Sequence, residues 1–358
     1  MMKTDERVSI ALRALYQSYG YRPYKVSRFE EYDLYMRNKR FLTSEHVLAF
    51  SDMDGRLLAL KPDVTLSVVK NTRDEDAPIR LCYAESVYRV PKNACGFREI
   101  MQTGVECIGG VDDYASGEVL MLAARSLAAI SPSYALDVAD MSIPAGVLAD
   151  AEEGLRGELL ALIAQKNLHG LTALCEEAGV NQKTRELLGA LIANYGPLGQ
   201  TLDAFEAMAL PPACQKGLGS LRRMERILSS LGIDGVNLDF SVVNDMNYYD
   251  GLVFTGFVDG VPSAVLRGGR YDRLMEKMGR RSQALGFAVY LDQLERLSAP
   301  QEGADVDVLV VYEREEEAQA AALLAAQVVA GGESVRVQRG ARTALRYGRL
   351  LRVGEDGR

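Results

Sequence analysis

Residues 79–110 have the sequence IRLCYAESVYRVPKNACGFREIMQTGVECIGG. Two stretches rich in apolar, aromatic and β-branched residues, IRLCYAESVYRV and EIMQTGVECIGG, flank the loop PKNACGF. Proline and glycine in this loop are turn formers, so the pattern predicts a pair of antiparallel strands. We therefore expect an α+β fold in which helices pack on an antiparallel sheet, not a doubly wound parallel sheet.

The sequence on both sides of this pair predicts further elements. Residues 5–18 have apolar side chains at helical spacing and predict a helix, whereas 46–62 predict two strands around the turn MDG. Residues 236–243 and 252–266 also predict strands, the latter a hairpin around DG. The segment ALGFAVYLDQLERL (284–297) predicts a glycine-containing helix.

The rest of the chain divides into a helical segment and a small tail. Residues 143–235 carry leucine and alanine at helical spacing and predict a separate helical insertion. Residues 301–358 predict strand, helix and strand followed by a short basic end, which is a truncated α/β region. The expected core then consists of 1–142 and 236–300. Arginines recur near the end and form either a solvated face or a basic stripe for nucleic acid or an acidic partner: Arg336, Arg339, Arg342, Arg346, Arg349 and Arg352.

Composition narrows the class of protein. The chain has 358 residues, of which 48% are hydrophobic and 25% charged, which is typical of a globular protein of two or three domains. A net charge of −8 argues against a surface built to bind phosphate backbones, so transfer RNA is not the expected partner. The start, MMKTDERVSIALRALY, has no uninterrupted apolar stretch of the signal-peptide kind. We expect a cytoplasmic protein without membrane insertion.

Cysteine and histidine residues offer little chemistry. The five cysteines are odd in number and show no CxxC spacing, which argues against a disulfide framework and a zinc site. His46 and His169 have no recognisable catalytic neighbours in the sequence. No metal and no cofactor are expected.

Polar residues in the predicted strands suggest a binding site. Asp63 and Thr65 lie two residues apart at a predicted strand end, where both side chains could offer acceptors to an ammonium group. Gln102 and Glu106 lie four apart, which places both on one face of a strand. A buried Glu106 would need a partner, which could be an ordinary structural ion pair with Arg89 or Arg98 of the adjacent strand.

Six blocks of sequence, taken in order, resemble the histidyl-tRNA synthetase family, whose members include the catalytically silent regulatory subunits of ATP phosphoribosyltransferase. The blocks are LLALKPDVT (57–65), SVYR (86–89), QTGVECIGG (102–110), NYYDGLVF (247–254), GGRYD (268–272) and ALGFAVYLDQL (284–294). The resemblance covers about residues 5–298 and implies the core of a class II aminoacyl-tRNA synthetase.

The resemblance implies a histidine pocket. It assigns the α-amino group of histidine to Asp63, Thr65 and Gln102, and the carboxylate to Arg89 and Gln102. Glu106 and Tyr249 would bracket the imidazole ring. The same blocks place Tyr248 and Tyr271 in the pocket. Asp63 departs from the family, because the synthetase usually has glutamate there.

The same blocks depart from the synthetase where it handles ATP. NDMNYY stands in place of RGLDYY, so Asn244 replaces the arginine that stabilises the developing charge. YLDQ stands in place of GLER, and the neutral Gln293 cannot give the bidentate contact of a guanidinium. YRVP stands in place of FRHE, which puts Pro91 at a glutamate. These losses imply a chain without catalysis of its own.

The expected function is therefore that of a histidine-binding regulatory subunit of short-form ATP phosphoribosyltransferase, the enzyme of the first step of histidine biosynthesis. By resemblance the chain would form a homodimer within a hetero-oligomer that contains a separate catalytic subunit. Ser27 replaces the proline of the first class motif, at the expected dimer contact. Two alternatives stay open: a divergent histidyl-tRNA synthetase, and a free-standing histidine-binding paralogue with another partner.

Overall fold

The computed structural model describes residues 4–42, 46–75, 77–90, 96–149, 151–242, 249–297 and 304–354. The chain divides into two compact units, one formed by 5–295 and the other by 296–358 together with residues 1–4 at the N-terminus. None of the helices in the described segments combines the length and the hydropathy that a membrane crossing requires.

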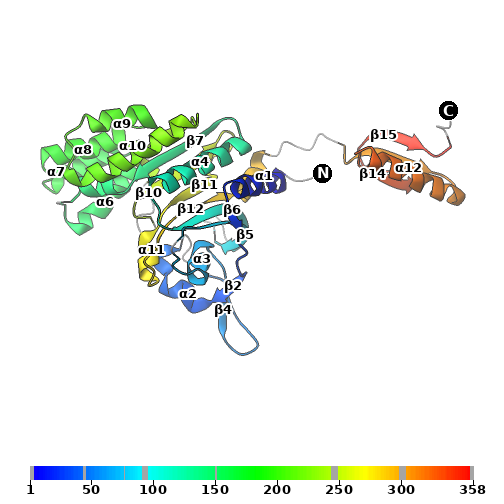
Figure 1. Cartoon of the computed structure of the whole chain (residues 1–358), viewed down its shortest axis with the longest axis horizontal. Coiled ribbons are helices and arrows are strands. Elements are labelled where there is room, and N and C mark those ends of the chain that lie inside the picture. The colour runs from blue at the N-terminus through cyan, green and yellow to red at the C-terminus, as the bar shows by residue number, and fades with distance from the viewer. Residues whose placement is uncertain are drawn as a thin grey trace. The chain divides into compact units, whose positions relative to one another are not determined.

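A mixed, mainly antiparallel sheet forms the centre of the larger unit (Figure 1). Its nine strands, counted over the described residues, lie in the order β1-β5-β6-β12-β11-β10-β7-β9-β8. Only β1 on β5 and β7 on β9 are parallel pairs. In chain order the strands are β1 (Arg22–Pro23), β5 (Ile79–Arg89), β6 (Arg98–Gly109), β7 (Tyr134–Asp140), β8 (Gly196–Pro197), β9 (Val236–Leu238), β10 (Leu252–Val258), β11 (Leu266–Arg270) and β12 (Gln283–Tyr290). The antiparallel α+β class expected from the sequence is confirmed.

The predicted pair of long strands is β5 and β6, which pair antiparallel from Ile79 opposite Ile108 to Arg89 opposite Arg98. One face of the sheet is covered by α4 (Asp113–Ile130), whose N-cap Asp112 accepts a hydrogen bond from the backbone N–H of Ala115. Twelve of the 18 residues of α4 are buried, because α10 (Gln215–Ser230) packs on its other side. The opposite face of the sheet remains available for a site.

A small sheet lies beside the opposite face of the large sheet, in the order β2-β4-β3. It contains β2 (Phe29–Glu31), β3 (Ala49–Ser51) and β4 (Leu57–Leu60), and β3 and β4 form the predicted hairpin around Gly55. The helices α2 (Tyr32–Arg37) and α3 (Thr65–Asn71) accompany it, and α1 (Thr4–Ser18) is the predicted first helix. Lys61, fully buried at the end of β4, lies 2.6 Å from the carboxylate of Glu85 on β5 and ties the two sheets together.

Helices occupy the segment between β7 and β9, as predicted (Figure 1, green). They are α5 (Ser142–Val147), α6 (Glu153–Ala164), α7 (Leu168–Glu177), α8 (Gln182–Ala193), α9 (Leu198–Glu206) and α10. β8, within this segment, and β9, directly after it, extend the main sheet. The proposal that 143–235 forms a domain of its own stays a prediction.

One predicted helix is wrong. ALGFAVYLDQLERL does not form a helix but strand β12 followed by the 3-10 helix η4 (Leu291–Leu297). A central strand buried on both faces is a continuous apolar run, which cannot be told from a buried helix by periodicity alone. The glycine that was expected within a helix, Gly286, instead lies at the centre of the sheet, opposite Glu106 and Gly269.

The C-terminal unit is a small α/β fold. Its parallel sheet, in the order β14-β13-β15, contains β13 (Val306–Tyr312), β14 (Val335–Arg339) and β15 (Tyr347–Arg352). The helix α12 (Ala318–Ala330) buries Val308 and Val310 against one face. Strand β15 lies where the sequence predicted only a short basic end. Several arginines near this end contact oxygen atoms of the same unit: Arg339 with Glu313 O, Arg346 with Asp305 and Arg349 with Glu333.

Candidate functional site

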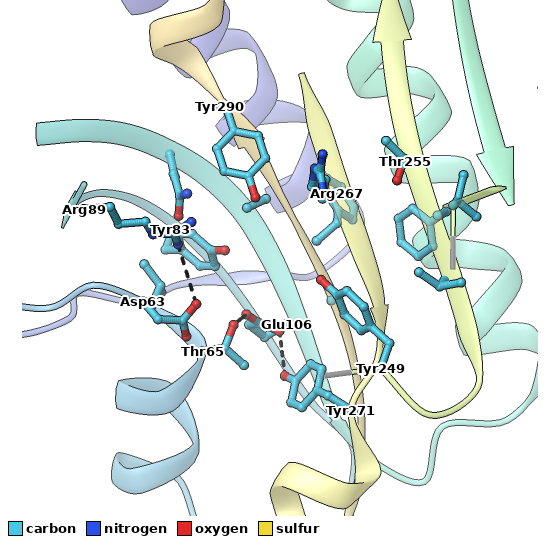
Figure 2. Close-up of a pocket in the computed structure, with 18 residues that line it drawn as sticks. Asp63, Thr65, Tyr83, Arg89, Glu106, Tyr249, Thr255, Arg267, Tyr271 and Tyr290 are labelled. Atoms are coloured by element: carbon cyan, nitrogen blue, oxygen red, sulfur yellow. Dashed lines mark hydrogen bonds and ion pairs between the residues drawn. The ribbon is translucent and has the colours of Figure 1, made fainter. Parts of the chain in front are cut away.

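A cavity opens on the face of the sheet that α4 leaves uncovered (Figure 2). Its empty volume is about 760 Å³, including the solvent at its mouth. The side chains that line it come from the segment before α3, from β5, β6, β10, β11 and β12, and from the start of α11 (Asp272–Lys277). Its polar lining residues are Asp63, Thr65, Tyr83, Arg89, Gln102, Glu106, Tyr249, Thr255, Arg267, Tyr271 and Tyr290.

Glu106 is the buried acid of this cavity, with 1% of its surface exposed. The hydroxyl of Thr65 donates to its Oε1 at 2.9 Å, and the hydroxyl of Tyr271 donates to its Oε2 at 2.6 Å. Burial raises the pKa of Glu106 to about 8, although the two hydroxyl donors favour the ionised form. Glu106 is therefore mostly protonated at neutral pH, and an acid with so strongly raised a pKa is typical of functional sites.

The sequence suggested that Asp63 and Thr65 lie at the end of an extended strand, and this is wrong. Thr65 is the first residue of α3, and Asp63 accepts a hydrogen bond at 3.0 Å from the backbone N–H of Leu66. Cap-type bonding of this kind compensates the orphan N–H groups of a helix N-terminus. The turn still brings both side chains into the cavity, as the resemblance requires.

Arg89 pairs with Asp63 and not with Glu106. Its Nη2 lies 3.7 Å from Asp63 Oδ2, and its Nε donates to the backbone carbonyl of Pro62. Burial raises the pKa of Asp63, and the neighbouring guanidinium opposes that rise. The structural ion pair considered for Glu106 is thus absent from the described residues, where hydroxyl groups surround this acid instead.

Gln102 and Glu106 lie on one face of β6, as their spacing predicted, and both line the cavity. Gln102 is 2% exposed, and its Nε2 has no hydrogen-bond partner among the described residues. A buried amide donor without a partner costs about 1–3 kcal/mol, so such an atom at a cavity wall indicates a ligand acceptor.

Two glycines, Gly286 of β12 and Gly269 of β11, leave room for cavity side chains. A side chain at Gly286 would collide with Glu106 Oε2 and with the carbonyl of Val105. A side chain at Gly269 would meet the ring of Tyr249 at 2.5 Å. The bare backbone at these positions of β11 and β12 lets the Glu106 carboxylate and the Tyr249 ring lie flat on the sheet.

The remaining predicted residues are placed as follows. Tyr249 and Tyr271 line the cavity, whereas Tyr248, Asn244 and Pro91 lie outside the described residues. Gln293 lies in η4 and does not line the cavity. It accepts a hydrogen bond from Ser263 and donates one to Asp292, both at 2.7 Å.

Sequence reasoning missed several lining residues, namely Tyr83, Thr255, Arg267 and Tyr290. Tyr83 and Thr255 could have been assigned to the same face as Glu106 by the alternation of side chains along strands. Arg267 and Tyr290 depended on knowing that β11 and β12 lie between β10 and β6, which is a long-range pairing that no local pattern gives.

Comparison with known proteins agrees with this fold. The family model described as histidyl-tRNA synthetase matches residues 2–294. The ATP phosphoribosyltransferase regulatory subunit of Acetivibrio thermocellus is 30% identical over 319 residues, covering 85% of this chain and 76% of the relative. The regulatory subunit of Clostridium kluyveri is 28% identical, covering 87% and 84%.

Solved structures show the same fold. An ATP phosphoribosyltransferase regulatory subunit/histidyl-tRNA synthetase from Bacillus halodurans matches with a TM-score of 0.81 at 23% identity, covering 98% of this chain and 93% of that one. The histidyl-tRNA synthetase of Nostoc sp. PCC 7120 matches with a TM-score of 0.78 at 16% identity, covering 95% and 83%. The resemblance predicted from the six sequence blocks is confirmed. The chain belongs to the histidyl-tRNA synthetase family and, within it, to the ATP phosphoribosyltransferase regulatory subunits.

Proposed function

We propose that the chain binds L-histidine in the cavity around Glu106 and thereby regulates a separate catalytic chain of ATP phosphoribosyltransferase. The observation that carries this proposal is the buried Glu106 carboxyl, held by Thr65 and Tyr271 at the floor of a polar cavity. An acid in this position accepts a hydrogen bond from a ring N–H, and the Tyr249 hydroxyl can serve the other ring nitrogen.

Selectivity follows from the cost of burial. An amino acid without a ring N–H would leave Glu106 without its ligand partner inside the cavity. Asp63, Thr65 and Gln102 lie at the side of the cavity formed by α3 and β6, where they are suited to the α-amino group. Arg89, beside Asp63, is suited to the carboxylate.

A catalytic partner is supported by the relatives' names and by one solved complex. The ATP phosphoribosyl transferase (HisG:HisZ) complex from Thermotoga maritima contains a chain that matches this one with a TM-score of 0.63 at 19% identity, covering 80% of this chain and 97% of that one. We propose a comparable assembly here, with the regulatory chain present as a homodimer. Feedback then requires histidine to bind one conformation of the assembly more tightly, by a coupling of about 1–3 kcal/mol.

The regulatory chain itself has no catalytic role in this proposal. A divergent histidyl-tRNA synthetase would instead catalyse histidine-dependent exchange of pyrophosphate into ATP. The neutral Gln293 amide, bonded to Ser263 and Asp292, cannot replace a triphosphate-binding arginine. We expect no exchange above background, and measurable exchange would restore the synthetase alternative.

A thermal-melt titration of the full chain against the twenty amino acids, with and without ATP, tests the ligand. Histidine at about 100 times its dissociation constant should stabilise the folded state by about 2.7 kcal/mol. We expect a shift with histidine only, unchanged by ATP. A shift with ATP alone would contradict the regulatory function.

The third possibility, a histidine-binding paralogue with another partner, predicts the same melting shift. Co-purification with the short catalytic chain separates the two, because only the regulatory subunit would bind it. Failure to bind that chain at micromolar concentrations would favour the paralogue.

A further inference from the structure

The cavity contains an arginine whose charge nothing in the described residues balances. Arg267 lies on β11 in the cavity wall and is exposed (Figure 2). Within the described segments no hydrogen bond or ion pair of its side chain is found. Arg89, in contrast, is 7% exposed and bonded to Asp63 and to the Pro62 carbonyl. Of the two cations among the described residues that line the cavity, Arg267 is therefore the one available to a ligand anion.

A second donor of the same cavity also lacks an acceptor among the described residues. The Nε2 of Gln102 is buried and has no hydrogen-bond partner there. An N–H donor of this kind requires an oxygen or an unprotonated nitrogen. A guanidinium and an amide N–H facing one cavity are the donor set that suits a carboxylate.

The register of the sheet places the two donors around an open floor. Arg267 pairs with Ala288, and Ala288 pairs with Gly104. Gln102 pairs with Tyr290, one residue pair farther along the same face. The Ala288 side chain between Arg267 and β6 is short, and the Tyr83 ring lies over Gly104 in the same row. Arg267, Ala288 and Gln102 all line the one cavity, so a ligand in it can contact β11 and β6 together.

The distance from Arg267 to Glu106 fits an amino acid. The two residues are two strands apart and offset by two residues, since Gly269 on β11 pairs with Gly286 and Gly286 with Glu106. At about 4.8 Å per strand and about 3.3 Å per residue, their Cα atoms lie roughly 12 Å apart. Because side chains on strands stand roughly perpendicular to the sheet, the polar ends of Arg267 and Glu106 are separated by about the same distance as their Cα atoms. Two hydrogen bonds of about 2.9 Å from these ends then leave about 6 Å for the ligand, close to the span from ring to carboxylate in an extended histidine.

We propose that Arg267, assisted by the Gln102 amide, binds the carboxylate of the ligand and makes the cavity specific for an intact amino acid. This assignment rests on the proposed function, which places the ring of the ligand at Glu106. The ligand carboxylate then pairs mainly with Arg267 and not with Arg89. The assignment made from the sequence had placed no charged residue of β11 in the cavity.

Calorimetric titration of the full chain with L-histidine and with L-histidinol tests the assignment, since histidinol has an alcohol in place of the carboxylate. The unmodified chain should prefer histidine by at least about 10-fold. Arg267→Gln should weaken the affinity for histidine by about 10- to 100-fold and change the affinity for histidinol by less than about 3-fold, so that the preference for histidine disappears. Arg267→Lys should keep part of the preference, because lysine keeps the positive charge but loses the bidentate geometry of the guanidinium.

Arg226→Gln serves as the matched control, because Arg226 is exposed on α10 and does not line the cavity. This variant should bind both ligands like the unmodified chain. The assignment is overturned if Arg267→Gln keeps the preference for histidine, or if it weakens both ligands equally. In either case the proposed function stands, whereas an unmodified chain that binds neither ligand would overturn both.

Discussion

The buried carboxyl of Glu106 is the group that we propose to recognise the ligand, and its burial also costs stability. Its hydroxyl partners stabilise the ionised form, but burial raises the pKa to about 8, so in the empty cavity at neutral pH the proton is mostly retained. Asp63 nearby raises the pKa of Glu106 further through charge repulsion. A ligand whose ring N–H donates to Glu106 compensates the burial of the carboxylate. A positive charge of the ligand near Asp63 offsets the charge repulsion.

The raised pKa predicts a pH-dependent cost in stability. Glu106 ionises near 4.5 when exposed and near 8 when folded, so the unfolded chain loses this proton first as the pH rises. Stability from this group is therefore complete below pH 4.5 and is lost between 4.5 and 8, by about 5 kcal/mol at most. Glu106→Gln should melt higher than the unmodified chain at pH 8 and lose this advantage at pH 5. An equal difference at both pH values would contradict the assignment.

The same pKa predicts that histidine binding releases a proton at pH 7. The ring N–H is accepted best by the ionised carboxylate, so binding should shift Glu106 from mostly protonated to ionised. The measured binding enthalpy should then vary with the ionisation enthalpy of the buffer. Identical enthalpies in phosphate and Tris at pH 7 would mean that Glu106 keeps its proton in the complex.

The pairing register of strands β6, β11 and β12 places the side chains of the cavity. Glycines at paired positions of β11 and β12 leave room for them. Gly286 on β12 leaves room for the Glu106 carboxylate, and Gly269 on β11 leaves room for Tyr249. A packed sheet interior tolerates extra atoms poorly, because neighbouring backbone cannot move independently.

Gly286→Ala should consequently damage both stability and binding. Its Cβ would meet the Val105 carbonyl and the Glu106 carboxylate, which predicts a loss of about 1–3 kcal/mol in the free energy of unfolding and a displaced acid. Gly110→Ala is the control, because nothing lies within 4 Å of its new Cβ. Urea denaturation of both variants checks the prediction, which fails if the two behave alike.

At the scale of elements, local sequence patterns predicted the segments in which apolar and polar residues recur at a regular spacing or turn residues are present. The pair β5 and β6, the hairpin around Gly55, and the first helix follow from such patterns. The hairpin around Gly260 was predicted with its second strand too early, because β11 begins at Leu266, where the predicted strand ends. Strand β12 did not, because burial on both faces removes the alternation. Helix α3 did not either, because threonine and two valines in TLSVVK favour a strand, whereas core packing and the Asp63 hydrogen bond at its start stabilise the helix. Asp63, Thr65, Gln102 and Glu106 were nevertheless placed in one site through the family blocks, whereas Arg267 depended on the strand order.

At the scale of the whole molecule, the cavity belongs to one unit. Every described residue that lines it falls between Asp63 and Tyr290, within the larger unit. The C-terminal α/β unit has its own core around Val308 and Val310, and several of its arginines contact acids or a carbonyl of the same unit.

Removal of residues 304–358 should therefore leave histidine binding nearly unchanged, with a dissociation constant within about 3-fold of the full chain. Circular dichroism would verify that the shortened chain is folded before titration. A large loss of affinity in a folded, shortened chain would mean that the C-terminal unit takes part in the site.

The measurement that tests the central claim most directly is a calorimetric titration of L-histidine, and separately of ATP, into the full chain. The account predicts saturable binding of one histidine per chain, abolished in Glu106→Gln, and no heat of binding with ATP. Absence of histidine binding in the full chain, or unchanged binding in Glu106→Gln, would contradict the account.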